Sequence, residues 1–272
     1  MMTTTKRLSV ILAVLALAAT ARSETKADLG LLSTCSDYAA CRERCENRDS
    51  NSCAALADAM FRDGGDRAQA LGWLDRSCAQ GFLHGCAKLG FRLIEKSHQP
   101  RDVARAVALF EKACAVGDPL GCSNLATLLW DGEGVARNPV RAGTLYDDAC
   151  RHGDAFSCGT LGSMYGLGEG VAKDVRRARA LYERGCDGKS ERACTLLGLA
   201  YARGEGAPKD PARGVSLFES SCQASDTKNC RQLGLALRSG NGAPRNPTRA
   251  NLMLARSCQL GLTTACEKDG PH

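Results

Sequence analysis

The stretch LGSMYGLGEGVAKDVRRARALYERGC, residues 161–186, contains the pattern that decides the fold. Counted from Cys158, apolar and small residues fall at positions zero, three, four and seven, which share one face of an α-helix. Gly168 is a residue type that ends helices in the left-handed conformation, and Asp174 is a typical N-cap. The stretch therefore predicts a helix, a turn and a second helix that reaches Cys186.

The same pattern recurs along the chain with a period of 36 residues. Helix-ending glycines recur at Gly132, Gly168, Gly204 and Gly240. N-cap candidates recur at Asp66, Asp102, Asn138, Asp174, Asp210 and Asn246. No run alternates with period two, so no strand is expected. Because one helix–turn–helix unit cannot bury its apolar face alone, we expect an all-α fold, a right-handed α-solenoid of 36-residue repeats.

Cysteines mark every junction between repeats. Two cysteines eight residues apart in one helix lie about 12 Å from each other and cannot bond. Two antiparallel helices joined by a short loop bring them close enough. The predicted disulfides are Cys45–Cys53, Cys78–Cys86, Cys114–Cys122, Cys150–Cys158, Cys186–Cys194, Cys222–Cys230 and Cys258–Cys266. Cys35 and Cys41 pair by elimination, but Cys41 and Cys45 are four apart on one helical face, which leaves a shuffled connectivity open.

The 16 cysteines and the amino terminus both point out of the reducing cytosol. Lys6 and Arg7 precede an apolar run that ends in a small-residue cleavage pattern, and cleavage is expected after Ala21. We expect a signal peptide at 1–21, a cysteine-containing helical cap at 22–52 and the repeat solenoid at 53–272, with about six repeats and a truncated last helix. The expected location is the periplasm or the exterior, without a later membrane helix.

The repeated markers resemble a known family. The pattern LGxxYxxGxGVxxDxxxAxxLYxxxC is similar to the Sel-one-like repeat, a relative of the tetratricopeptide repeat, and residues 161–186 match it at nearly every marker. A disulfide at every helix junction resembles the Helicobacter cysteine-rich protein family. The resemblance implies a right-handed superhelix and binding of a protein or peptide partner. It also implies an alternative function, penicillin binding or weak β-lactamase activity.

Catalytic signals are missing from the sequence itself. The motifs S-D-N and K-T-G of serine β-lactamases are absent, as are H-E-x-x-H and G-x-S-x-G. No C-x2-C spacing suggests a metal, and no motif suggests a cofactor. The net charge of +6 and the 5% aromatic content do not favour nucleic acid. We expect no catalytic residue, metal or cofactor; if the chain is an enzyme, a β-lactamase-type hydrolase is expected.

The remaining candidate is a surface. In the first helix of each repeat, positions two, five and nine point away from the buried arc, and tetratricopeptide-like stacking would align them as a concave groove for an extended peptide. Among these positions are Lys88, Phe91, Asn124, Thr127, Thr160, Ser163, Arg203 and Gln232. The later repeats are more apolar, with Leu167, Leu196, Leu199 and Leu235. Asn124 and Thr160 are expected to bond the peptide backbone.

Overall fold

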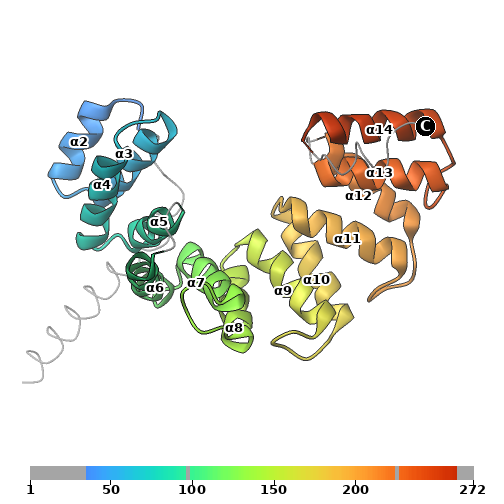
Figure 1. Cartoon of the computed structure of the whole chain (residues 1–272), viewed down its shortest axis with the longest axis horizontal. Coiled ribbons are helices and arrows are strands. Elements are labelled where there is room, and N and C mark those ends of the chain that lie inside the picture. Colours follow the sequence, from blue (N-terminus) through green and yellow to red (C-terminus); the bar gives the residue numbers. More distant parts are fainter. Residues whose placement is uncertain (1–34, 96–98, 224–226, 262–272) are drawn as a thin grey trace, which may run out of the picture. The chain divides into compact units, whose positions relative to one another are not determined.

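The computed structural model describes residues 35–95, 99–223 and 227–261 (Figure 1). All regular structure in these ranges is helical. The helices are α2 Tyr38–Glu46, α3 Ser50–Arg62, α4 Arg67–Ala79, α5 Leu83–Ile94, α6 Pro100–Cys114, α7 Pro119–Asp131, α8 Pro139–Arg151, α9 Ala155–Leu167, α10 Val175–Asp187, α11 Glu191–Arg203, α12 Pro211–Gln223, α13 Thr227–Ser239 and α14 Pro247–Gln259. No helix in the described ranges has both the length and the apolar character needed to span a membrane.

The chain forms two compact units, residues 1–85 and 86–272, with the division inside α5. In each unit, helices pack mainly against their neighbours in sequence, as expected for an all-α repeat solenoid. The predicted signal peptide, the start of the predicted cap and the truncated last helix with Cys266 lie outside the described residues.

Leucine–glycine pairs in the first helix of a repeat make room for the second helix. A Cβ atom added at Gly162 would lie 2.6 Å from the Tyr182 ring, and one at Gly234 would lie 2.7 Å from Leu254. Gly198 stands in the same relation to the Phe218 ring. These contacts explain why a small residue recurs one position after the leucine, because a larger side chain there would push the two helices apart.

The predicted helix boundaries are confirmed in the later repeats. Gly132, Gly168 and Gly204 take positive φ angles of 76°, 81° and 77° as C-caps. Asn138 and Asp174 accept hydrogen bonds from first-turn amides of α8 and α10.

The prediction for Asp102 is wrong. Helix α6 begins earlier, at Pro100, and its N-cap is Gln99, which makes no side-chain capping bond. Asp102 instead lies within the first turn of α6. The reason is local, because Pro100 already has the φ angle of a first helical residue and lacks the amide hydrogen that a cap would satisfy.

Candidate functional site

Disulfides join the last turn of one helix to the first turn of the next. Cys114–Cys122, Cys150–Cys158, Cys186–Cys194 and Cys222–Cys230 have Cα separations of 4.6, 4.7, 4.5 and 4.5 Å. In the first unit, Cys45–Cys53 spans 4.7 Å and Cys35–Cys41 spans 6.1 Å. Cys78, Cys86 and Cys258 are also disulfide-bonded, and no cysteine is free in the described ranges. The second unit is therefore a covalently braced frame for its surface residues.

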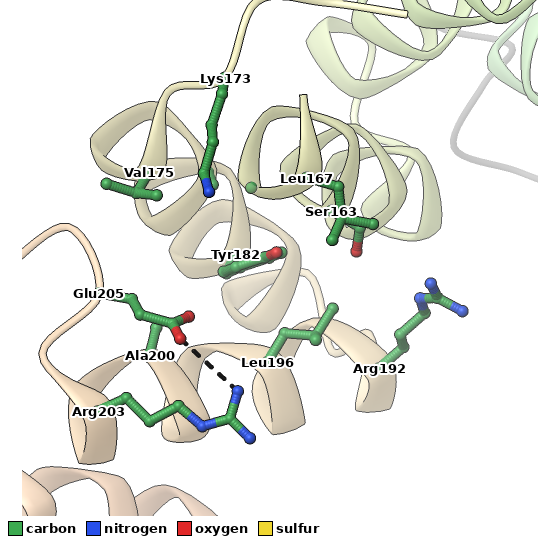
Figure 2. A pocket seen from close by; sticks show the side chains of 12 residues that line it. Ser163, Leu167, Lys173, Val175, Tyr182, Arg192, Leu196, Ala200, Arg203 and Glu205 are labelled. Carbon is green, nitrogen blue, oxygen red and sulfur yellow. Dashed lines mark ion pairs between the residues drawn. The ribbon is translucent and has the colours of Figure 1, made fainter. Parts of the chain in front are cut away.

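The second unit contains a cavity of about 530 Å³ bounded by α9, α10 and α11, here called cavity 1 (Figure 2). Its apolar lining comes from all three helices and includes Leu167, Val175, Tyr182, Leu196 and Ala200. Leu167 is 68% exposed although it is a large apolar side chain. Cavity 1 thus presents apolar surface to the solvent, which is the usual property of a binding site.

Tyr182 forms the inner wall of cavity 1. Its side chain is only 8% exposed, and a Cβ atom added at Gly166 would lie 3.3 Å from its hydroxyl oxygen. Burial raises the pKa of Tyr182, and a hydrogen bond with Ser163 opposes that rise. The tyrosine is therefore neutral at physiological pH, and its ring is a fixed apolar wall.

Cationic side chains surround the apolar lining. Lys173 comes from the loop before α10, Arg192 from the first turn of α11 and Arg203 from its last residue. Arg203 forms an ion pair of 3.6 Å with Glu205, drawn as a dashed line in Figure 2. Lys173 and Arg192 are exposed and form no ion pair with any described residue. The rim therefore carries an excess of positive charge.

A second, smaller cavity of about 180 Å³, here called cavity 2, lies one repeat further along and is lined from α11, α12 and α13. Its lining includes Leu199, Val215, Phe218 and Leu235. Arg203 lines both cavities. Helix α11 therefore separates two consecutive hollows on one surface of the second unit.

The structure brings together only the later part of the predicted groove. Ser163 and Arg203 line cavity 1, and Arg203 and Gln232 line cavity 2. Lys88 and Phe91 line neither cavity. Phe91 is 39% exposed, and the guanidinium of Arg92 lies 5.6 Å from its ring centroid.

Asn124 and Thr160, which were predicted to bond a peptide backbone, line neither cavity. Thr160 is 8% exposed, and its hydroxyl oxygen is buried without a hydrogen-bond partner, so it cannot reach a peptide on the surface. Close packing explains its burial, because the neighbouring Gly159 would place a Cβ atom 3.1 Å from Ala193 of α11. The Asn124 side-chain amide donates to the Leu120 carbonyl at 2.8 Å, within its own helix. Thr127 is likewise engaged, 2.9 Å from the Tyr146 hydroxyl.

The lining residues of cavity 1 that sequence reasoning missed include Lys173, Val175, Tyr182 and Arg192. They lie in the loop, in α10 and in the first turn of α11, whereas the prediction considered one face of each first helix. The sequence contained a signal for Lys173. This lysine follows the glycine pair of its repeat at a fixed position, and Lys209 occupies the same position one repeat later. Contact of Tyr182 with the cavity depends on how deeply three helices pack, which spacing does not show.

Comparison with known proteins now identifies the family. The family model described as Sel1 repeat matches residues 50–82, 83–118, 119–154, 158–190, 191–226 and 230–262. The chain belongs to the Sel1 repeat family. This confirms the resemblance found in the sequence. None of the curated proteins compared matches this Sel1 repeat chain.

Two solved structures, the first two of the three that follow, show the same fold. A protective antigen of uropathogenic Escherichia coli strains has 23% identity and a TM-score of 0.72, over 84% of this chain and 50% of that one. This Sel1 repeat chain therefore spans half the length of that antigen. A Sel1 repeat protein from Oxalobacter formigenes has 23% identity and a TM-score of 0.70, over 79% and 85% of the two chains. Cysteine rich protein B of Helicobacter pylori has 26% identity and a TM-score of 0.40, over 48% and 95%.

Proposed function

We propose that this Sel1 repeat chain is a non-catalytic scaffold of the periplasm or the exterior that binds an extended segment of a partner protein in cavity 1. The observation that carries this proposal is an apolar hollow of about 530 Å³ with the exposed Leu167 at its edge. The disulfides support an oxidising location, because they persist only there in most proteins. An exported chain would reach it through the predicted signal peptide at 1–21.

Rigidity of the cavity walls supports binding. Cys150–Cys158 and Cys186–Cys194 brace the two helix junctions that flank α9 and α11. A braced hollow loses little conformational entropy when it takes up a partner, so more of the contact energy contributes to affinity. The same bracing places Leu167 and Leu196 at fixed positions, which favours recognition of side chains at a defined spacing.

A charge placed in cavity 1 tests the proposal. Leu167→Asp would put a carboxylate on an apolar lining position, whereas Leu252→Asp makes the same change at a 63% exposed leucine of α14 that lines neither cavity. Both variants are surface changes, so both are expected to fold, which circular dichroism checks. A random-peptide display library is selected on the wild-type protein, and enriched peptides are measured on both variants.

We expect the peptides to bind the wild type and Leu252→Asp alike, and Leu167→Asp at least about tenfold more weakly, because a buried leucine contributes about 1.5–3 kcal/mol. A library that yields no enriched peptide, or peptides indifferent to Leu167→Asp, would overturn the proposal.

The alternative of β-lactam binding or hydrolysis rests on the family resemblance and stays a separate hypothesis. Pure, oxidised protein incubated with a chromogenic cephalosporin tests it directly. Turnover that copurifies with the chain through several columns, and that changes when its cavities are mutated, would replace the non-catalytic proposal. Turnover equal to that of a mock purification would remove the alternative.

A further inference from the structure

We infer that the segment bound by this chain is acidic and runs through both cavities, with one apolar side chain in each and side-chain carboxylates against the cationic rim. This inference rests on the proposed function and adds the chemistry of the partner. Three observations carry it: the continuity of the two cavities, the unpaired charges and the spacing of the helices.

Continuity comes from α11. One side of this helix gives Leu196 and Ala200 to cavity 1, and the adjoining side gives Leu199 and Ala202 to cavity 2. Arg203, at its last turn, lines both. An occupant of cavity 1 that follows this surface therefore enters cavity 2.

Charge complementarity selects acidic residues. Four charged side chains line cavity 1, of which Lys173, Arg192 and Arg203 are positive and only Glu205 is negative. Glu205 is already paired with Arg203. In cavity 2, Arg203 is the one charged residue of the lining. A carboxylate beside an apolar anchor would gain Coulomb attraction at this rim, whereas a lysine there would be repelled.

The distance between neighbouring helices determines how far apart the two apolar side chains of the bound segment must lie. Packed helices lie about 8–10 Å apart, and a segment in the extended polyproline II conformation advances about 3.1 Å per residue with three residues per turn. Since α9, α11 and α13 succeed one another along the surface, side chains three positions apart, which share one face of such a segment, would reach consecutive cavities. The two intervening positions then face the rim around Arg203, where carboxylates are best placed.

Synthetic peptides test the inference. The first probe is a fluorescein-labelled peptide of about eight residues, amidated at its C-terminus, with two leucines three positions apart and glutamates at the intervening and flanking positions. A second probe replaces every glutamate by glutamine, a third replaces them by lysine, and a fourth is the glutamine peptide with a free C-terminal carboxylate. Fluorescence anisotropy gives Kd at two salt concentrations.

The matched variants of the protein reverse the charge of exposed side chains. Lys173→Glu combined with Arg192→Glu reverses the rim of cavity 1, and Lys209→Glu reverses the residue that corresponds to Lys173 one repeat later, which lines neither cavity. All three side chains are exposed, so folding is expected to be unchanged.

We expect the glutamate peptide to bind the wild type and Lys209→Glu equally and the double variant about tenfold more weakly, with a smaller salt effect. Equal binding of the glutamine or lysine peptide would overturn the inference, and so would no loss in the double variant. Binding that requires the free C-terminus would assign the site to a chain end instead. Sedimentation that shows self-association lost in Leu167→Asp would assign it to a second copy.

Failure here is distinguishable from failure of the proposed function. If library peptides depend on Leu167 but are neutral or basic, the scaffold proposal stands and the acidic partner does not. If no peptide of any charge binds, both fall.

Discussion

The left-handed glycine in the loop between the two helices of a repeat has open space around it in the first unit and close neighbours in the second. Between α3 and α4, Gly64 has a φ of +73°, and a Cβ atom added there would meet nothing within 4 Å. Between α11 and α12, Gly206 has a φ of +76°, and its added Cβ would strike the carbonyl oxygen of Val175, the first residue of α10. Gly170 and Gly242 meet Pro139 and Pro211 in the same way.

This difference shows that the second glycine of each Gly-x-Gly loop is a contact between repeats. In the second unit the loop touches the start of the helix that belongs to the preceding repeat, so each repeat is held by its disulfide and by its loop. In the first unit the left-handed glycine of the α3–α4 loop makes no such contact, and this loop reaches the preceding helix through the Tyr38–Asp63 hydrogen bond instead. The two units should therefore respond differently to the same glycine substitution.

The largest effect is expected from Gly206→Ala compared with Gly64→Ala. At Gly64 the new methyl group adds only the strain of a left-handed alanine, about 1–2 kcal/mol. At Gly206 the clash with the Val175 backbone adds about 1–3 kcal/mol more, since a backbone carbonyl cannot rotate away. Urea unfolding followed by circular dichroism measures both. Equal losses would mean that the loop of the second unit moves freely and holds nothing.

Disulfide removal should have a similar effect in the two units, because both units contain the same kind of junction disulfide although their glycine loops differ. Cys45–Cys53 in the first unit and Cys150–Cys158 in the second close loops of the same length, with a separation of 8 residues. Chain entropy predicts that each contributes about 2.5 kcal/mol. We therefore expect paired Cys→Ser replacements to cost similar amounts in urea unfolding. A much smaller cost for Cys150–Cys158 would show that the docked loops make the second unit's disulfides redundant.

Tyrosines in the two units differ in their response to alkaline pH. Burial raises the pKa of Tyr146 in α8 to about 12, whereas Tyr38 in the first unit is exposed and its pKa is raised by a hydrogen bond with Asp63. A phenol whose folded pKa exceeds its unfolded value near 10 favours folding in its neutral form. The stability it contributes is therefore complete below pH 10 and is lost as pH rises toward about 12.

The variant Tyr146→Phe isolates this effect. At neutral pH we expect it to be less stable by about 1 kcal/mol, because the hydrogen bond with Thr127 is lost. Between pH 10 and 12 the unfolding midpoint of the wild type should fall relative to that of the variant, which has no phenol at this position to ionise. Parallel curves for the two proteins across this range would show that Tyr146 does not titrate on unfolding.

Much of the fold was predictable because its determinants are local. Residues 161–186 contain a helix face, a glycine stop and an aspartate start, and each depends on neighbours a few positions away. The contacts of Gly206 and Thr160 were not predictable, since they depend on a different repeat. Gly206 signals only a positive φ in the sequence, and Thr160 reads as a surface position until the close approach of α11 at Gly159 is known.

The candidate site shows the same division. Ser163 and Arg203 were found because first-helix positions five and nine stay on the surface in every repeat. Lys173 and Arg192 were missed, since the excess of positive charge appears only when a loop and the start of a helix are brought to the edge of one hollow. An inspection of one helix face at a time cannot show the combined charge of side chains that come from three different elements.

The smallest effect concerns the caps, which should be equal in the two units. Asp66 accepts hydrogen bonds from the amides of Ala68 and Gln69, and Asp174 accepts from those of Arg176 and Arg177. Replacing either aspartate by alanine should cost about 1 kcal/mol. Asp102→Ala should cost only about 0.3–0.5 kcal/mol, because its carboxylate lies inside the first turn of α6 and acts through the helix dipole. Urea unfolding of the three variants measures the order, and a cost for Asp102→Ala as large as the others would mean that α6 starts at Asp102 in solution.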